Sequence, residues 1–94
     1  MYEGEWNEGE RNGFGILSKI NSGRKEVIYY GCWVEGEKQG FGILYSLHSV
    51  YRGNFLKNKK HGYGQMWWDS GQHYEGSWKN DKFHGTGILS MGNQ

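Results

Sequence analysis

Hydrophobic and polar residues alternate along four short stretches of the chain, and all four stretches share one order of residue types. Each stretch starts with a tyrosine, has a glycine two residues later and a large aromatic residue four residues later. Alternation with a period of two is typical of a β-strand. The tyrosines are Tyr2, Tyr29, Tyr51 and Tyr74, and the large aromatic residues are Trp6, Trp33, Phe55 and Trp78. We therefore predict a strand at each of these positions.

A second strand follows each of these predicted strands. It opens with two glycines separated by one residue, in GFGILS, GFGILY, GYGQMWW and GTGILS. Between the two strands of a unit lies Gly9, Gly36, Asn58 or Asp81. These residue types tolerate a positive φ and favour a turn. Each unit therefore predicts a β-hairpin, and the chain predicts one array of repeats over residues 2–28, 29–50, 51–73 and 74–94.

Side-chain alternation divides each predicted hairpin into two faces. The tyrosine, the first glycine and the large aromatic residue share the aromatic face, and we expect both glycines of the return strand to share it too. The return strands should add Leu17, Leu44 and Met66. We expect the glycines to make room for rings, so that a side chain at Gly13 or Gly15 would collide with a tryptophan. The mixed face carries Glu3, Glu5, Arg52, Asn54, Glu75 and Ser77 together with Phe14, Ile16, Phe41 and Ile43.

The links between the units are less regular than the units themselves. The link over residues 20–28, INSGRKEVI, is long, and we expect it to bulge out as an exposed loop. Trp67 and Trp68 are neighbours in a predicted strand, so one should join the aromatic face and the other should lie on the mixed face. The tryptophan on the mixed face either marks a binding spot or packs against the adjacent strand.

Composition narrows the class of protein. The 94 residues have a mean hydropathy of −0.90, but 17% are aromatic, which is unlike a disordered segment. The net charge of +1 gives no sign of a nucleic-acid partner. The single cysteine, Cys32, favours a reducing compartment such as the cytoplasm. No stretch is apolar enough for a membrane span, and the acidic first residues do not resemble a signal peptide.

The glycine pairs, histidines and cysteine of the chain do not have the spacing of a catalytic, phosphate-binding or metal-binding motif. The glycine pairs lack the Lys-Ser/Thr of a phosphate-binding loop. His61 and His84 occupy the same position in successive units, so we do not expect them to converge on a metal. No histidine is placed by sequence to activate Cys32. We therefore expect no catalytic residue, no metal site and no cofactor.

The unit YEGEWNEGERNGFG and its counterparts resemble the MORN (membrane occupation and recognition nexus) repeat over nearly the whole chain. Small departures are Phe55 in place of Trp, Asn58 and Asp81 in place of Gly, and Thr86 inside the last glycine pair. The resemblance implies an all-β fold: an elongated single-layer antiparallel sheet of four consecutive β-hairpin repeats with an aromatic-lined groove. It also implies a non-enzymatic protein-interaction scaffold, of the kind found in ciliary and cytoskeletal assemblies.

A protein partner should lie along this groove as an amphipathic helix or an extended segment. The residues expected to contact it are Tyr2, Trp6, Tyr29, Trp33, Tyr51, Phe55, Tyr74, Trp78, Leu17, Leu44 and Met66. Because central anchors usually dominate binding, Trp33 and Phe55 should matter more than Tyr2 or Trp78.

The alternative function is that of a membrane-surface adaptor. Lys57, Lys59 and Lys60 form the one basic run, and each could contribute about 1 kcal/mol beside anionic lipid headgroups. The near-neutral net charge makes such contact weak. We also expect the chain to be part of a longer array, with unpaired outer strands that allow self-association.

Overall fold

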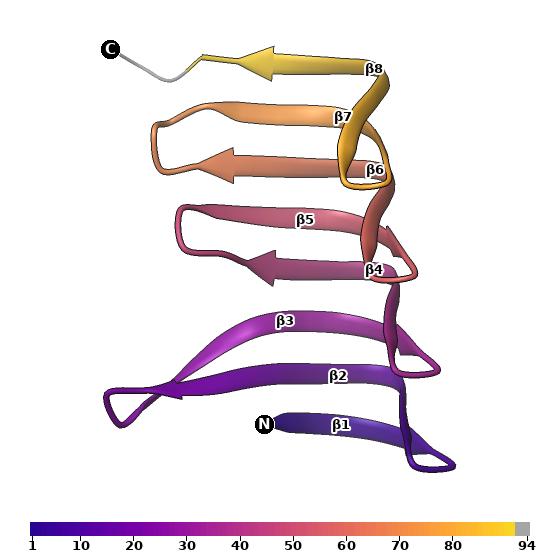
Figure 1. Ribbon diagram of the computed structural model, residues 1–94. Helices are drawn as coiled ribbons and strands as arrows, with labels where there is room; N and C mark the ends of the chain where they lie inside the picture. The colour runs from indigo at the N-terminus through magenta and orange to yellow at the C-terminus, as the bar shows by residue number, and fades with distance from the viewer. Residues whose placement is uncertain (92–94) are drawn as a thin grey trace.

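The computed structural model of the protein describes residues 1–91, which form one antiparallel sheet of eight strands in chain order (Figure 1). The strands are β1 (Tyr2–Asn7), β2 (Glu10–Asn21), β3 (Arg24–Val34), β4 (Glu37–Tyr45), β5 (Ser49–Leu56), β6 (Lys59–Trp68), β7 (His73–Lys79) and β8 (Lys82–Ser90). The molecule measures 46 × 34 × 15 Å, so it is one layer thick. The predicted all-β fold of consecutive hairpins is confirmed.

Each hairpin turns through two residues that both have a positive φ. In the β3–β4 hairpin these are Glu35, with φ of 50°, and Gly36, with φ of 81°. Two positive φ values define a type I′ turn, whose twist matches that of the flanking strands. The predicted turns at Gly36 and its three counterparts are therefore confirmed, and the residue before each of them shares the left-handed conformation.

A bulge bends every hairpin near its turn. In the second unit, Gly31 pairs with Gly42 and Trp33 pairs with Lys38, so Cys32 alone faces three residues of β4. Gly40 lies among those three and has a φ of 91°. Extra residues in one strand bend it and increase its twist. Figure 1 shows the result, since the turn ends of the hairpins curl away from the plane of the sheet.

The link over residues 20–28 is not a bulging loop. Lys19 pairs with Glu26 and Asn21 pairs with Arg24, so β2 and β3 continue past the other strands as a projecting hairpin (Figure 1). Its turn consists of Ser22 and Gly23, both with a positive φ. The expectation of a loop was wrong because the extra residues are numerous enough to pair with each other.

The core is a single row of rings on the aromatic face. In the first three units, the tyrosine ring lies edge-to-face between the large aromatic ring of its own unit and that of the next unit. Tyr29, for example, lies 5.1 Å from Trp33 and 5.3 Å from Phe55 between ring centroids. We call this set the ring row: Trp6, Tyr2, Trp33, Tyr29, Phe55, Tyr51, Trp78 and Tyr74. Edge-to-face pairs contribute about 0.5–1.5 kcal/mol beyond the area they bury.

The glycines make room for tyrosines, not for tryptophans. A side chain at Gly15 or Gly42 would fall inside contact distance of the tyrosine ring of the same unit. A side chain at Gly13 would instead meet Glu5 on the mixed face. The predicted collision with a tryptophan is therefore wrong at both positions. The bulge explains the difference at Gly13, because it takes this residue out of the regular alternation.

Candidate interaction surfaces

The residues predicted to line the groove do gather on one face, but most of their rings are buried. Trp33 is 2% exposed and Phe55 is 4% exposed, whereas Trp6 at the first strand is 58% exposed. Tyr2, Leu17, Leu44 and Met66 are half-buried and pack against the core. Tyr29, Tyr51, Tyr74 and Trp78 are buried. A partner on this face would therefore meet the half-buried side chains before it met the central rings.

The polar atoms of the buried rings have partners within the sheet. Each tyrosine hydroxyl donates a hydrogen bond to a backbone carbonyl three residues later, as Tyr29 does to Cys32 at 3.0 Å. Nε1 of Trp33 donates to the carbonyl of Gly15, and Nε1 of Trp78 donates to that of Gly64, both at 3.3 Å. Burial raises the pKa of the Tyr29 hydroxyl well above its ordinary value. These groups support the fold and are not free to act on a ligand.

A row of cations covers the ring row, and sequence reasoning missed it. Arg11, Lys38 and Lys60 each lie five residues after the large aromatic residue of their own unit. The Arg11 guanidinium carbon lies 5.0 Å from the centre of the Trp33 ring, and the other two cations lie within 5.8 Å of two rings each. Cation–π contacts of this kind stabilise by about 0.5–2 kcal/mol. We call Arg11, Lys38 and Lys60 the cation row. Its only sign in the sequence was the equal spacing of these residues from the large aromatic residues.

Asn58 and Asp81 do more than permit a turn. The Asn58 side chain accepts a hydrogen bond from the backbone N–H of Lys38 at 2.8 Å, and the Asp81 side chain accepts one from that of Lys60 at 2.8 Å. Both lysines belong to the preceding unit, so these side chains tie one repeat to the next. Gly36 makes only the backbone contact, in which its N–H donates to the carbonyl of Arg11 at 2.9 Å.

The three lysines predicted to contact lipid do not form one surface. Lys57 and Lys59 are exposed at the β5–β6 turn. The Lys60 side chain is only 16% exposed, and its ammonium group lies 3.7 Å from the Asp81 carboxylate on the aromatic face. The strand alternation separates Lys59 from Lys60. Any contact with a flat bilayer at this turn would depend on Lys57 and Lys59.

The mixed face presents rings to solvent. Phe14 is 45% exposed and packs edge-to-face on Tyr30 at 4.9 Å, and Phe41 and Tyr63 are exposed as well. Trp68 joins the core, whereas Trp67 lies on the mixed face, as alternation predicted. Trp67 stacks on His73 of β7 at 5.0 Å yet stays 39% exposed. Trp67 therefore packs against the adjacent strand and also presents part of its ring to solvent, where a partner could bind.

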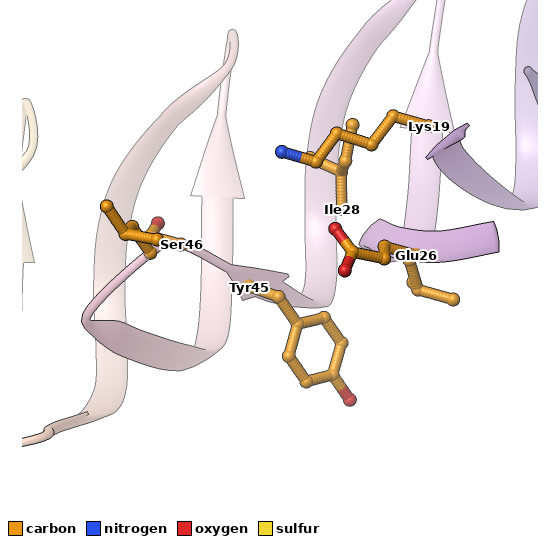
Figure 2. A pocket seen from close by; sticks show the side chains of 7 residues that line it. Lys19, Glu26, Ile28, Tyr45 and Ser46 are labelled. Carbon is orange, nitrogen blue, oxygen red and sulfur yellow. The ribbon is translucent and has the colours of Figure 1, made fainter. Parts of the chain in front are cut away.

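An open pocket of about 460 Å³ lies between the projecting β2–β3 hairpin and the β4–β5 link. Figure 2 shows Lys19 and Glu26 reaching from the hairpin toward Ser46, with the ring of Tyr45 pointing away. One ammonium group and one carboxylate at a wide opening do not form a catalytic arrangement. Among residues 1–91, no three His, Cys, Asp or Glu side chains lie together as metal ligands. The same residues contain no helix long and apolar enough to cross a bilayer.

The family model that matches the chain is the MORN repeat, over residues 2–24, 29–46, 51–73 and 74–94. The chain belongs to the MORN repeat family. MORN repeats are generally modules that interact with proteins or membranes, and the family is not known for catalysis. No curated protein matches the chain. The four matches begin at the four tyrosines of the ring row.

Proposed function

We propose that the protein is a non-enzymatic scaffold that binds a segment of a partner protein along the aromatic face of its MORN array. The observation that carries the proposal is the half-buried layer above the ring row. The cations of three units lie there opposite the large aromatic residues, and the aliphatic side chains of the same units lie opposite the tyrosines, so the face has one cationic and one aliphatic row: Arg11, Lys38 and Lys60, and Leu17, Leu44 and Met66. Long cationic side chains beside apolar groups suit a partner that offers both kinds of contact.

The partner segment is expected to contact this outer layer rather than the central rings. Trp33 and Phe55 are almost fully buried by their neighbours, so their loss would act through the fold. Leu44 and Met66 are half-buried and border the ring row. Hot spots for binding are therefore expected at Leu44, Met66 and the cation row.

Adjacent residues of β4 provide the test of this function. Leu44 lies on the aromatic face and Ile43 on the mixed face, and both are half-buried. A leucine analogue that carries a diazirine would replace either residue, and the full chain would be irradiated in cell extract. A discrete cross-linked protein at position 44 and none at position 43 supports the proposal. Cross-linking at position 43 alone would place the partner on the mixed face and contradict it.

A membrane-surface adaptor is the second candidate function. The observation in its favour is the pair of exposed cations, Lys57 and Lys59, which lie two residues apart at the β5–β6 turn. The measurement is sedimentation with vesicles of phosphatidylserine and phosphatidylcholine at low and high salt. Binding that disappears in Lys57→Ser/Lys59→Ser and in high salt would support the adaptor. Binding that survives both changes would exclude this turn as the contact.

The cellular setting is part of the same proposal. We infer a cytoplasmic protein of a ciliary or cytoskeletal assembly from the family resemblance and the single free cysteine, Cys32. The long first link and the order of repeats also resemble MORN repeat-containing protein 3. Imaging of the tagged protein in ciliated cells is the test, and uniform staining that excludes cilia and cytoskeleton would contradict the assignment.

Self-association is a further part of the proposal. Within residues 1–91, β1 and β8 each pair with one neighbour only, and such edges invite pairing with another strand. We infer that the array extends or pairs through these edges in a longer assembly. Sedimentation equilibrium over a wide concentration range would show association, whereas a monomer at all concentrations would contradict pairing between copies.

A further inference from the structure

The cation row has a regular spacing that a ligand can match. Arg11 lies on β2, Lys38 on β4 and Lys60 on β6, each at the position that pairs with the large aromatic residue of its own hairpin. Neighbouring strands are about 4.8 Å apart, so successive members of the row are about 10 Å apart. The row therefore runs across the strands, along the long direction of the array.

Two of the three cations of this row have no carboxylate partner among residues 1–91. Among residues 1–91, Lys60 has the carboxylate of Asp81 at 3.7 Å, but no carboxylate lies within 4.0 Å of Arg11 or Lys38. Lys38 is half-buried, and its burial, followed by repulsion from Arg11, lowers the pKa of its ammonium group. A half-buried pair of like charges is stabilised by an anion that approaches both. The first two units thus present two cations that an anion can approach, although the more distant Asp81 carboxylate favours the charged form of Lys38.

The other end of the same face has an aromatic ring at the position of the cation. The fourth unit has Phe83 where the others have a cation, and its ring stacks on Tyr74 at 4.1 Å. An open pocket of about 340 Å³ lies there, and four apolar and three charged side chains line it: Phe83, Met66, Trp68 and Trp78, with Lys60, Asp81 and Lys82. The aromatic face therefore changes along the array from unpaired cations to a pocket that aromatic side chains and a methionine line on one side. A segment that lies along this face would need the matching order of side chains.

We propose that Arg11 and Lys38 bind two carboxylates of an acidic protein segment, and that the pocket beside Phe83 receives an apolar side chain further along the same segment. This inference rests on the proposed binding along the aromatic face and names the chemistry of the partner.

The spacing suits a segment in the polyproline II conformation, which rises about 3.1 Å per residue with three residues per turn. Arg11 and Lys38 are two strands apart, which corresponds to about three residues of the segment. Lys38 and Phe83 are four strands apart, or about six residues. Multiples of three place all the contacting side chains on one side of such a helix. The expected pattern is acid-x-x-acid-x-x-x-x-x-apolar.

The test uses a synthetic peptide with this pattern, built from Glu, Phe and Pro/Ser spacers and labelled with fluorescein. Two matched peptides carry Gln at both Glu positions or the same residues in reverse order. The full chain would be compared with Lys38→Met, which keeps most of the aliphatic stem and removes the charge. Arg52→Met is the control, because Arg52 is an exposed cation on the mixed face. Circular dichroism would show that both variants stay folded.

The inference predicts binding of the Glu peptide at least roughly tenfold tighter than of the Gln peptide, with higher affinity in the stated order than in reverse. Lys38→Met should lose that preference and Arg52→Met should keep it. Equal affinity for the Glu and Gln peptides, or no binding of the Glu peptide, would overturn the inference. So would phosphatidylserine vesicles that displace the peptide and sediment the wild type but not Lys38→Met, since the anion would then be a lipid.

Failure here can be told apart from failure of the proposed function. Cross-linking of a partner at position 44 together with equal affinity for both peptides would leave the aromatic face as the binding surface and remove only its preference for acidic segments. Cross-linking at position 43 alone, whatever the peptides do, would remove the binding surface itself.

Discussion

Tyr29 and Tyr30 are neighbours in β3 and have opposite roles. Tyr29 lies on the aromatic face, is 0% exposed and contacts Trp33 and Phe55. Tyr30 lies on the mixed face, is 44% exposed and contacts Phe14. The difference shows that of these two neighbouring tyrosines only the one with a glycine beneath its ring, Gly42 under Tyr29, is buried. Aromatic content alone therefore does not identify the core.

The two faces should respond differently to loss of a ring. Trp33→Ala removes a buried ring that touches two tyrosines, and such changes cost about 3–5 kcal/mol. Phe41→Ala, on the mixed face at 49% exposure, should cost about 1 kcal/mol or less. Urea unfolding of both variants checks the contrast. Similar midpoints would mean that the ring row is not the core.

The glycine beneath Tyr29 should be nearly as sensitive. Gly42→Ala places a methyl group where the Tyr29 ring lies, and overpacking of this kind costs about 1–3 kcal/mol. Gly87→Ala makes the same collision with Tyr74, but on β8, which has one neighbour and can shift. We expect a larger loss of unfolding free energy at Gly42. A Gly42→Ala variant as stable as wild type would show that the ring occupies another position.

Removal of a single hydroxyl should have a smaller effect that depends on pH. Tyr29→Phe deletes the hydrogen bond to the Cys32 carbonyl and should cost about 1 kcal/mol at neutral pH. Because burial raises the pKa of Tyr29, the folded state keeps this proton above pH ~10, where an unfolded tyrosine loses it. Stability is therefore full below pH ~10 and falls above it.

Tyr29→Phe removes one such group, so unfolding free energy should fall less steeply with alkaline pH than in wild type. Urea unfolding between neutral and alkaline pH measures the slope. Tyr30→Phe, on the mixed face, is the control at neutral pH and should leave the midpoint unchanged. An unchanged alkaline slope in Tyr29→Phe would show that this hydroxyl is accessible to solvent.

Phe55→Trp should produce the smallest change, in the stabilising direction. Trp33 and Trp78 each donate to a glycine carbonyl of the preceding unit, a bond that Phe55 lacks the N–H to make. A tryptophan at this position should donate to the Gly42 carbonyl and add about 1 kcal/mol. Thermal unfolding of the variant and the wild type measures this gain in stability. A lower melting temperature would show that the third unit is too tightly packed for the larger ring.

The sequence predicted the hairpins, their order and the face shared by Tyr29, Trp33 and Leu44, because residue types and spacing recur in every unit. It did not predict the burial of Trp33, which depends on the ring of Tyr2 from the preceding hairpin. It also misplaced Gly13, because a bulge changes the direction of a residue without changing the spacing.

The candidate site was less predictable than the fold. The cation row was visible only as an equal spacing, since its meaning depends on rings that the lysines cover in space. Lys57, Lys59 and Lys60 looked like one basic patch because they are close in sequence. Strand alternation and the Asp81 carboxylate separate Lys60 from the other two lysines. The sequence alone gives no sign that Asp81 pairs with Lys60.

Hydroxyl-radical footprinting of the full chain, read by mass spectrometry at single residues, tests the central contrast most directly. The rate of oxidation reports the solvent exposure of each ring. The two-face account predicts that Tyr30 is oxidised at least roughly tenfold faster than Tyr29, in line with their exposed fractions of 44% and 0%. Equal rates at the two adjacent tyrosines would contradict it, because they would mean that the ring row is open to water.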